Sequence, residues 1–171
     1  NKNFSNSKSV ALWQSNIPTR EKFSIQQLNR LPVSLNAALE SADRLNADLM
    51  IAPEGTLPAG QKFLPNPNVS LLSGGFRISE GRQRSSLLFF DKGKSTYSEF
   101  IDKHRLVPLG EWLPPLPSFF AKGFSFVGGL EAGDASRFFR WRSSPIAVAI
   151  CYELSNGHSL AKAVDSGAEW L

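Results

Sequence analysis

The chain has only one cysteine, Cys151, and two histidines among its 171 residues. A single cysteine excludes an internal disulfide, and the lack of CxxC pairs or clustered histidines gives no metal site. No apolar run approaches the ~20 residues of a membrane-spanning helix, and the N-terminus lacks a signal-peptide core. Lys and Arg are scattered along the chain, so the net charge of +4 does not favour nucleic acid as a partner.

The composition is that of an ordinary globular protein, with 42% hydrophobic and 20% charged residues. The length is near that of one domain, so we expect one domain or part of one. Residues 1–9 are polar and are expected to form a linker that leads into an ordered region over residues 10–171. The chain starts without methionine and ends on an apolar run typical of the beginning of a strand, which indicates a piece of a longer protein.

The N-terminal part of the sequence predicts a β-α-β unit. Residues 10–14 are expected to form a short buried strand. Apolar residues recur at spacings of three and four from about residue 34 to residue 46, which predicts an amphipathic helix. A second buried strand is expected over residues 49–52, with Glu54 in the loop of residues 53–58 that follows it.

The rest of the chain predicts more strands and a second helix. Strands are expected over residues 70–77, 85–90, 95–101, 138–141 and 146–150, and a helix over residues 160–164. Residues 108–137 form a long irregular stretch rich in Pro, Gly and Phe, and loops of such length inside a domain are usually functional. Alternating strands and helices at both ends of the chain predict an α/β layered fold.

Three reactive side chains follow expected strands: Glu54, Lys103 and Cys151. In open α/β sheets, sites gather beyond the carboxyl ends of the strands, so these side chains are expected to lie close together. A thiol with an ordinary pKa of about 8.5 is mostly protonated at neutral pH and needs a base or a nearby cation. Glu54 can accept the proton, and Lys103 can stabilise the thiolate and an oxyanion. The set predicts an acyl-transfer site, with the backbone N–H of Tyr152 as a second oxyanion donor.

Each of these residues also has a purely structural interpretation. A free cysteine such as Cys151 is often a small apolar side chain in the core. Glu54 can cap a loop at the end of a strand, and Lys103 can belong to an exposed basic surface. Glu111 and Glu153 can be ordinary ion-pair partners of Arg or Lys. A Cys-His dyad with either histidine is the main competing mechanism.

Three strings, in their order along the chain, resemble the nitrilase (carbon-nitrogen hydrolase) superfamily. They are Pro-Glu-Gly at residues 53–55, Asp-Lys-His-Arg-Leu-Val-Pro-Leu-Gly-Glu-Trp-Leu-Pro at 102–114, and Ala-Ile-Cys-Tyr-Glu at 149–153. More narrowly, the second and third strings resemble the apolipoprotein N-acyltransferase family of bacterial membrane enzymes. The resemblance runs over residues 10–171 and implies a nitrilase-like α-β-β-α sandwich whose C-terminal part is missing from this chain.

The resemblance also implies roles for single residues. Glu54 would be the general base, Lys103 the stabiliser of the thiolate and the oxyanion, and Cys151 the nucleophile. Three further positions match residues that support the site in this family: Glu111, Tyr152 and Glu153. Relatives place a histidine two residues after the catalytic lysine, where this chain has Arg105, so the role of His104 stays open.

The reaction that the resemblance implies is a ping-pong transfer. Cys151 would take an acyl chain from a membrane phospholipid as a thioester, and the amino group of a diacylglyceryl-cysteine lipoprotein would then accept that chain. The implied partners are this phospholipid, the apolipoprotein and the membrane surface, with no cofactor. The implied location is the bacterial inner membrane, with the catalytic domain facing the periplasm or exterior and residues 1–9 leading from a membrane region. Residues 115–126 would dip into lipid or close over acyl chains, or else cover the core.

Two other functions stay open. The first is a soluble nitrilase-type amidase that hydrolyses a small amide with the same triad. The second is a non-catalytic, membrane-peripheral binding module in which Cys151 is merely packed. The acyl acceptor separates the first, because an amidase uses water, and labelling of the thiol by an electrophilic phospholipid separates the second. As a piece of a longer protein, the isolated chain is expected to be inactive and prone to aggregate through an open sheet edge.

Overall fold

The structure is a computed structural model that describes residues 8–22, 24–60, 68–108, 110–112, 129–136, 138–141 and 144–171. It divides into two compact units. The N-terminal unit comprises Asn1–Gly74 and Leu88–Phe100, and the C-terminal unit comprises Gly75–Leu87 and Ile101–Leu171. Most of the expected linker and all of residues 115–126 lie outside the described residues. Within the described part of the chain, no helix has both the length and the apolar character needed to cross a bilayer.

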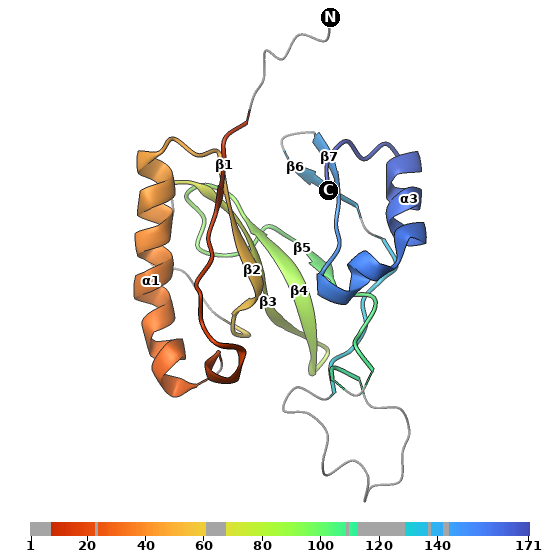
Figure 1. The fold of residues 1–171 in the computed structure, drawn as a ribbon, viewed down its shortest axis with the longest axis horizontal. Helices are drawn as coiled ribbons and strands as arrows, with labels where there is room; N and C mark the ends of the chain where they lie inside the picture. Colours follow the sequence, from red (N-terminus) through yellow and green to blue (C-terminus); the bar gives the residue numbers. More distant parts are fainter. Residues whose placement is uncertain are drawn as a thin grey trace, which may run out of the picture. The chain divides into compact units, whose positions relative to one another are not determined.

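The described residues form a mixture of strands and helices (Figure 1). The strands are β1 (Val10–Leu12), β2 (Leu49–Leu57), β3 (Ser70–Ser79), β4 (Arg82–Phe90), β5 (Glu99–Asp102), β6 (Phe138–Trp141) and β7 (Ser144–Ala147). The helices are α1 (Ile25–Arg44) and α3 (Gly157–Asp165), with 3-10 turns at η1 (Thr19–Glu21) and η2 (Cys151–Ser155). One sheet has the strand order β1-β2-β3-β4-β5, and a second pairs β6 with β7. The α/β class expected from the sequence is confirmed.

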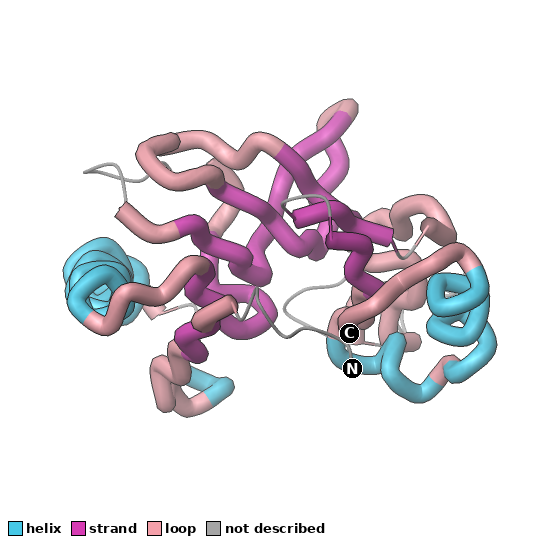
Figure 2. Tube along the Cα trace, turned by 90° about the horizontal axis from the view of Figure 1, so that it is seen from above, coloured by secondary structure: helices cyan, strands magenta, loops and turns pink. Residues whose placement is uncertain are grey.

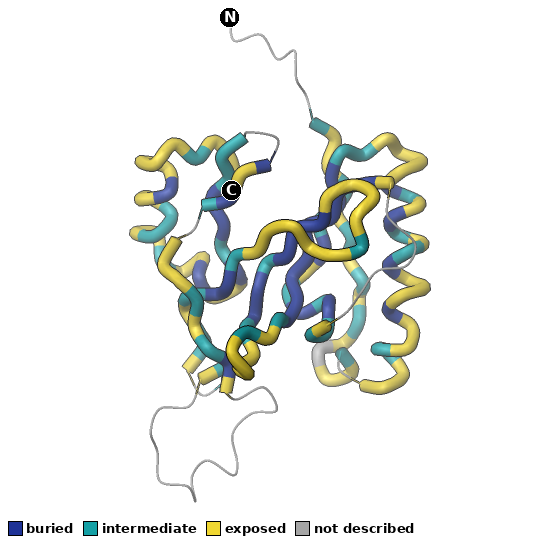
Figure 3. The backbone as a smooth tube through the Cα atoms, turned by 180° about the vertical axis from the view of Figure 1, so that it is seen from behind, coloured by how far each residue is buried: buried dark blue, intermediate teal, exposed yellow. Residues whose placement is uncertain are grey.

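The core of the N-terminal unit lies between α1 and the neighbouring strands. Four buried residues recur every three or four positions along one side of α1: Leu31, Leu35, Leu39 and Ala42. They form one cluster with buried residues of β2, β3 and β4, among them Met50, Leu71 and Phe90. Figure 2 shows α1 beside these strands, and Figure 3 shows buried positions along the strands and exposed positions on the outer side of the helix.

The predicted β-α-β unit is confirmed, but its helix is longer than expected. β1 pairs in parallel with β2, with Val10 opposite Leu49. α1 begins at Ile25 instead of near residue 34, and the Ser24 side chain caps it by accepting the Gln27 N–H at 3.3 Å. Pro32, which lacks the N–H of a regular helical residue, lies inside the helix. The prediction was wrong here because the apolar spacing becomes regular only after this proline.

Two of the reactive residues lie elsewhere than the sequence indicated. β2 continues to Leu57, so Glu54 lies inside this strand and not in a loop after it. β7 ends at Ala147, so Cys151 does not end a strand but begins η2. In both places the apolar run alone did not determine the strand boundary, because pairing with other strands outweighs local preference. Lys103 directly follows β5, as predicted.

The C-terminal unit contains the β6-β7 pair and α3. The two strands run antiparallel, with Phe138 opposite Ala147, and α3 lies beside β7 (Figure 1). Trp170 forms a parallel bridge with Ile146, and its carbonyl accepts the Ala147 N–H at 2.7 Å. The apolar end of the chain therefore pairs as the beginning of a strand, as its sequence indicated.

Replacing Leu35 by alanine should lower the free energy of unfolding by about 2–5 kcal/mol, because it empties a site in the core of the N-terminal unit. The side chain of Leu35 is 1% exposed, whereas Val33 on the same helix is 74% exposed. Val33→Ala is therefore the matched control and should change stability by less than about 0.5 kcal/mol. Urea unfolding followed by tryptophan fluorescence measures both, and equal losses would contradict this assignment of the core.

Candidate active site

Cys151 lies on a strained turn. Its backbone φ is 51°, a left-handed conformation that costs a non-glycine residue about 1–2 kcal/mol. The residue is exposed, although Ile150 before it is buried. Strain of this kind concentrates at functional sites, where a sharp turn presents a side chain. The geometry therefore favours an accessible nucleophile over a thiol packed in the core.

Lys103 is a buried cation with an acidic partner. Its side chain is 1% exposed, which contradicts the interpretation as part of a wet basic surface. Its Nζ donates to Oε1 of Glu111 at 2.8 Å, and Oε2 of Glu111 accepts the Val107 N–H at 2.8 Å. A buried charge requires such pairing. The contact agrees with the role of steadying Lys103 that the resemblance gives to Glu111.

The carboxylate of Glu153 joins two segments of the C-terminal unit. The residue is 4% exposed, so its charge is also buried. Oε1 accepts the N–H groups of His104 at 2.7 Å and Arg105 at 3.1 Å, and Oε2 accepts the N–H of Ile150 at 2.9 Å. One oxygen thus holds the turn after the buried lysine, and the other holds the residue before the thiol. Sequence reasoning gave Glu153 a supporting role but not these contacts, which span about fifty residues of chain.

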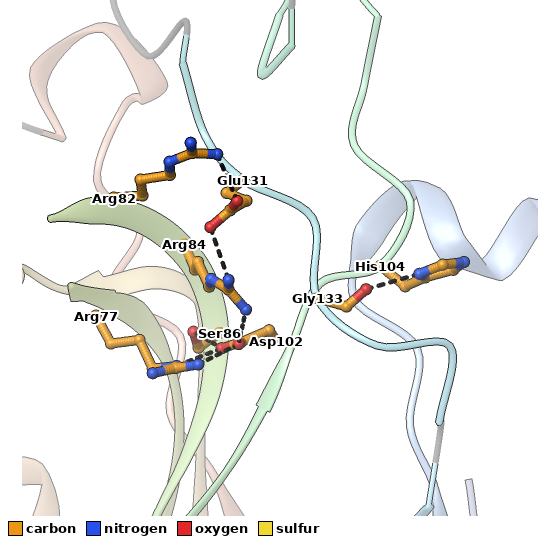
Figure 4. Close-up of polar contacts among 8 residues, drawn as sticks. All are labelled: Arg77, Arg82, Arg84, Ser86, Asp102, His104, Glu131 and Gly133. Atoms are coloured by element: carbon orange, nitrogen blue, oxygen red, sulfur yellow. Dashed lines mark hydrogen bonds and ion pairs between the residues drawn. The ribbon is translucent and has the colours of Figure 1, made fainter. Parts of the chain in front are cut away.

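His104 has a defined hydrogen bond, whereas Tyr152 is partly exposed. The Nδ1 of His104 lies 2.8 Å from the carbonyl oxygen of Gly133 (Figure 4). Because a carbonyl only accepts, Nδ1 carries the proton, and Nε2 of the neutral ring is left with its lone pair. Tyr152 is 46% exposed in η2, and the oxyanion role of its backbone N–H stays a prediction.

A cleft of about 640 Å³ opens in the C-terminal unit. Its lining combines the apolar side chains of Leu106, Trp112 and Leu130 with His104 and the charged pair Arg82 and Glu131. Its volume falls within the ~300–1,000 Å³ usual for small-molecule sites. Among the described residues, no group of three or more His, Cys, Asp or Glu side chains could hold a metal ion.

Glu54 lies in the N-terminal unit, where its backbone is tightly held. The ammonium of Lys22 donates to the carbonyl oxygen of Glu54. A methyl group at Gly74 on β3 would come within 2.7 Å of the Pro53 carbonyl oxygen, and closer still to the Cα of Glu54. Neither contact could be predicted from spacing, because Lys22 and Gly74 lie far from Glu54 in the chain.

The six residues assigned by resemblance are thus distributed over both units. Five belong to the C-terminal unit and Glu54 belongs to the N-terminal unit. Within the C-terminal unit, Lys103 contacts Glu111 directly, and Glu153 ties the segments that carry the lysine and the thiol. The catalytic roles themselves stay predictions.

Comparison with known proteins identifies the family. The chain is 62% identical over 168 residues to the apolipoprotein N-acyltransferase of Prochlorococcus marinus, which covers 98% of this chain and 34% of that protein. It is 53% identical over 166 residues to the enzyme of the same name from Parasynechococcus marenigrum, which covers 95% of this chain and 35% of that protein. This chain is homologous to one segment of the apolipoprotein N-acyltransferases. It spans about a third of the length of these curated relatives.

Solved structures show the fold of this acyltransferase segment. An amidase of the nitrilase superfamily from Nesterenkonia AN1 superposes with a TM-score of 0.62, over 94% of this chain and 62% of that one. At 12% identity the likeness concerns the fold alone, and it confirms the nitrilase-like architecture that the three sequence strings implied. No protein-family model matches the chain.

Replacing Glu153 by glutamine should lower the free energy of unfolding by about 1–3 kcal/mol. The amide has one acceptor oxygen, and its NH2 group would face backbone donors that the carboxylate now satisfies. Glu169→Gln is the control, because Glu169 is exposed and should tolerate the same change within about 0.5 kcal/mol. Thermal unfolding of both variants measures the difference, and an unchanged midpoint for Glu153→Gln would contradict the bonding described.

Replacing Gly74 by alanine should cost about 1–3 kcal/mol, because the added methyl overlaps the backbone of β2 at Glu54. Gly157→Ala provides the control: a methyl at Gly157 meets nothing within 4 Å, and the change should be neutral or stabilise by less than about 1 kcal/mol. Urea unfolding compares the two, and a neutral result for Gly74→Ala would show that β2 and β3 can separate at this point.

Proposed function

We propose that this chain is the acyl-carrying part of an apolipoprotein N-acyltransferase. The main observation behind the proposal is the 62% identity to such an enzyme over 98% of this chain. The C-terminal unit supports the chemistry, because Cys151 is exposed on a strained turn and Lys103 is a buried cation fixed by Glu111. Neither feature is required of a module that only binds a membrane.

In the first half of the proposed reaction, the thiolate of Cys151 attacks the carbonyl carbon of a phospholipid ester. The C–S bond forms, the ester C–O bond breaks, and the leaving alkoxide takes a proton to become a lysophospholipid. In the second half, the α-amino group of a diacylglyceryl-cysteine attacks the thioester. An amide forms, the C–S bond breaks, and the proton of the amine returns to the thiolate by way of the base. Glu54 is the proposed base in both halves.

Lys103 is proposed to stabilise the negative charge that develops in both halves. The charge resides on the thiolate and on the oxyanion of each tetrahedral intermediate. A cation that is withdrawn from water acts more strongly than an exposed one, because little solvent screens it. Glu111 prevents this cation from moving out to solvent, and Glu153 holds the turn after it.

The cleft beside these residues supports an amphipathic substrate. Leu106, Trp112 and Leu130 offer apolar surface to acyl or glyceryl carbons, and the guanidinium of Arg82 suits a phosphate headgroup. The proposed substrates are therefore a membrane phospholipid and the lipid-modified N-terminus of an apolipoprotein. The proposed setting is the bacterial inner membrane, with the site on its periplasmic or exterior face.

The test is to trap the thioester in the complete gene product. The protein is incubated with phospholipid vesicles that carry a deuterated acyl chain, and the peptide containing Cys151 is weighed by mass spectrometry. A deuterated adduct should appear, hydroxylamine should release it, and a diacylglyceryl-cysteine peptide should remove it and gain the same mass on its amino group. Cys151→Ala should abolish the adduct, and Lys103→Met should slow its formation by roughly 100-fold or more.

Lys162→Met is the matched control for Lys103, because Lys162 is an exposed lysine on α3. It should leave the rate of adduct formation within about twofold of the unaltered protein. Release of free fatty acid without need of an amine, or of ammonia from small amides, would support a hydrolase instead. An absence of any adduct would leave the non-catalytic binding module as the better interpretation.

A further inference from the structure

Asp102 lies directly before Lys103 and is 8% exposed. Its carboxylate accepts hydrogen bonds from Arg77 through Nε at 2.5 Å and also through Nη2. It also accepts from Oγ of Ser86 at 2.7 Å and from Nη1 of Arg84 at 3.3 Å. Figure 4 shows the three side chains converging on this carboxylate. Four donors from β3 and β4 therefore hold the last residue of β5.

The ion pairs continue to the segment on the other side of Lys103. Arg84 also pairs with Glu131 through Nη2 at 2.6 Å, and Arg82 pairs with the same carboxylate at 2.7 Å (Figure 4). The backbone N–H of Glu131 donates to the carbonyl of Gln83 on β4 at 2.9 Å. Glu131 is thus fixed to β4 by both its side chain and its backbone.

This segment completes the hydrogen bonding of the Lys103 backbone. The N–H of Lys103 donates to the Ser85 carbonyl at 2.8 Å, and its own carbonyl accepts the N–H of Gly133 at 2.9 Å. A methyl group at Gly133 would come within 3.0 Å of the Asp102 carbonyl oxygen, and closer still to the Cβ of Asp102. The backbone of Lys103 is therefore held on both sides, with Asp102 wedged between the arginines and Gly133.

We propose that Asp102 is a positioning residue for Lys103, acting through Arg77, Arg84 and the close approach of Gly133. The inference rests on the proposed function, in which Lys103 stabilises the thiolate of Cys151. The network fixes the backbone from which the lysine side chain extends, and Glu111 fixes the far end of that side chain. Asp102 itself does not touch the substrate.

The network is poorly suited to serve stability alone. Buried ion pairs repay little of their desolvation cost, and Nε of Arg84 has no hydrogen-bond partner within the described part of the chain. A position next to the proposed oxyanion stabiliser gives such a network another purpose. Errors of about 1 Å in the placement of a reacting group can reduce a rate by roughly 100-fold.

The carboxylate keeps its charge wherever a thiol titrates. Burial acts to raise the pKa of Asp102, but the hydrogen bonds from Arg77, Ser86 and Arg84 outweigh it, so that this pKa lies below its ordinary value. Because the folded pKa is lowered, the contribution of Asp102 to stability is present above the unfolded pKa and is lost as pH falls through the folded one. Titration of Asp102 therefore does not overlap that of Cys151.

The test measures the reactivity of Cys151 with iodoacetamide from pH 5 to pH 10 in the complete gene product. In the unaltered protein, the midpoint of alkylation should lie below the ordinary thiol value of about 8.5. Asp102→Asn should raise this midpoint by about 0.5 to 1 pH unit, because Lys103 is held less closely. It should also lower kcat for thioester formation by roughly 10- to 100-fold, with KM changed by less than about twofold.

Glu99→Gln is the control, because Glu99 is an exposed acid on the same strand and should change neither quantity. Ser86→Ala removes a single hydrogen bond and should shift both in the same direction by less, which keeps the test open if Asp102→Asn does not fold. A loss of melting temperature in either variant without a shift in midpoint or kcat would overturn the positioning role. An ordinary midpoint in the unaltered protein would instead contradict the proposed function, and this inference with it.

Discussion

The hydrogen bonding of the Glu153 carboxylate is the interaction on which the arrangement of the C-terminal unit depends. Three backbone N–H groups from two distant segments end on its two oxygens. Buried N–H groups without an acceptor are costly, so these segments cannot separate without leaving donors unsatisfied. The turn that carries the nucleophile and the turn that follows the buried lysine therefore form one rigid element.

Acidic side chains in this unit act chiefly as acceptors that hold other groups in place. Glu111 pairs with the Lys103 ammonium and also accepts a backbone N–H, and Asp102 receives donors from two strands. The lysine is thus constrained at its N–H, at its carbonyl and at its ammonium. Rigid support of this kind is what an electrostatic stabiliser needs, because its benefit depends on being in place before charge develops.

The sequence predicted the α/β class, the β-α-β unit and the position of Lys103 after a strand, because these depend on local periodicity and turn residues. The family could be predicted from the strings around Glu54, Lys103 and Cys151. The extension of β2 through Glu54 could not, because strand pairing overrides Pro53 and Gly55 as local breakers. The contacts of Asp102 with Arg77 and of Glu153 with His104 join residues far apart in the chain, and no spacing rule encodes them.

The left-handed backbone at Cys151 sets stability and chemistry against each other at one position. Glycine adopts this conformation without penalty, so it is the replacement that would relieve the strain, and it removes the sulfur at the same time. Alanine or serine would remove the thiol but keep the unfavourable turn. Selection for a more stable fold alone would therefore drive this position toward an inactive residue, and only a requirement for the sulfur opposes that drift.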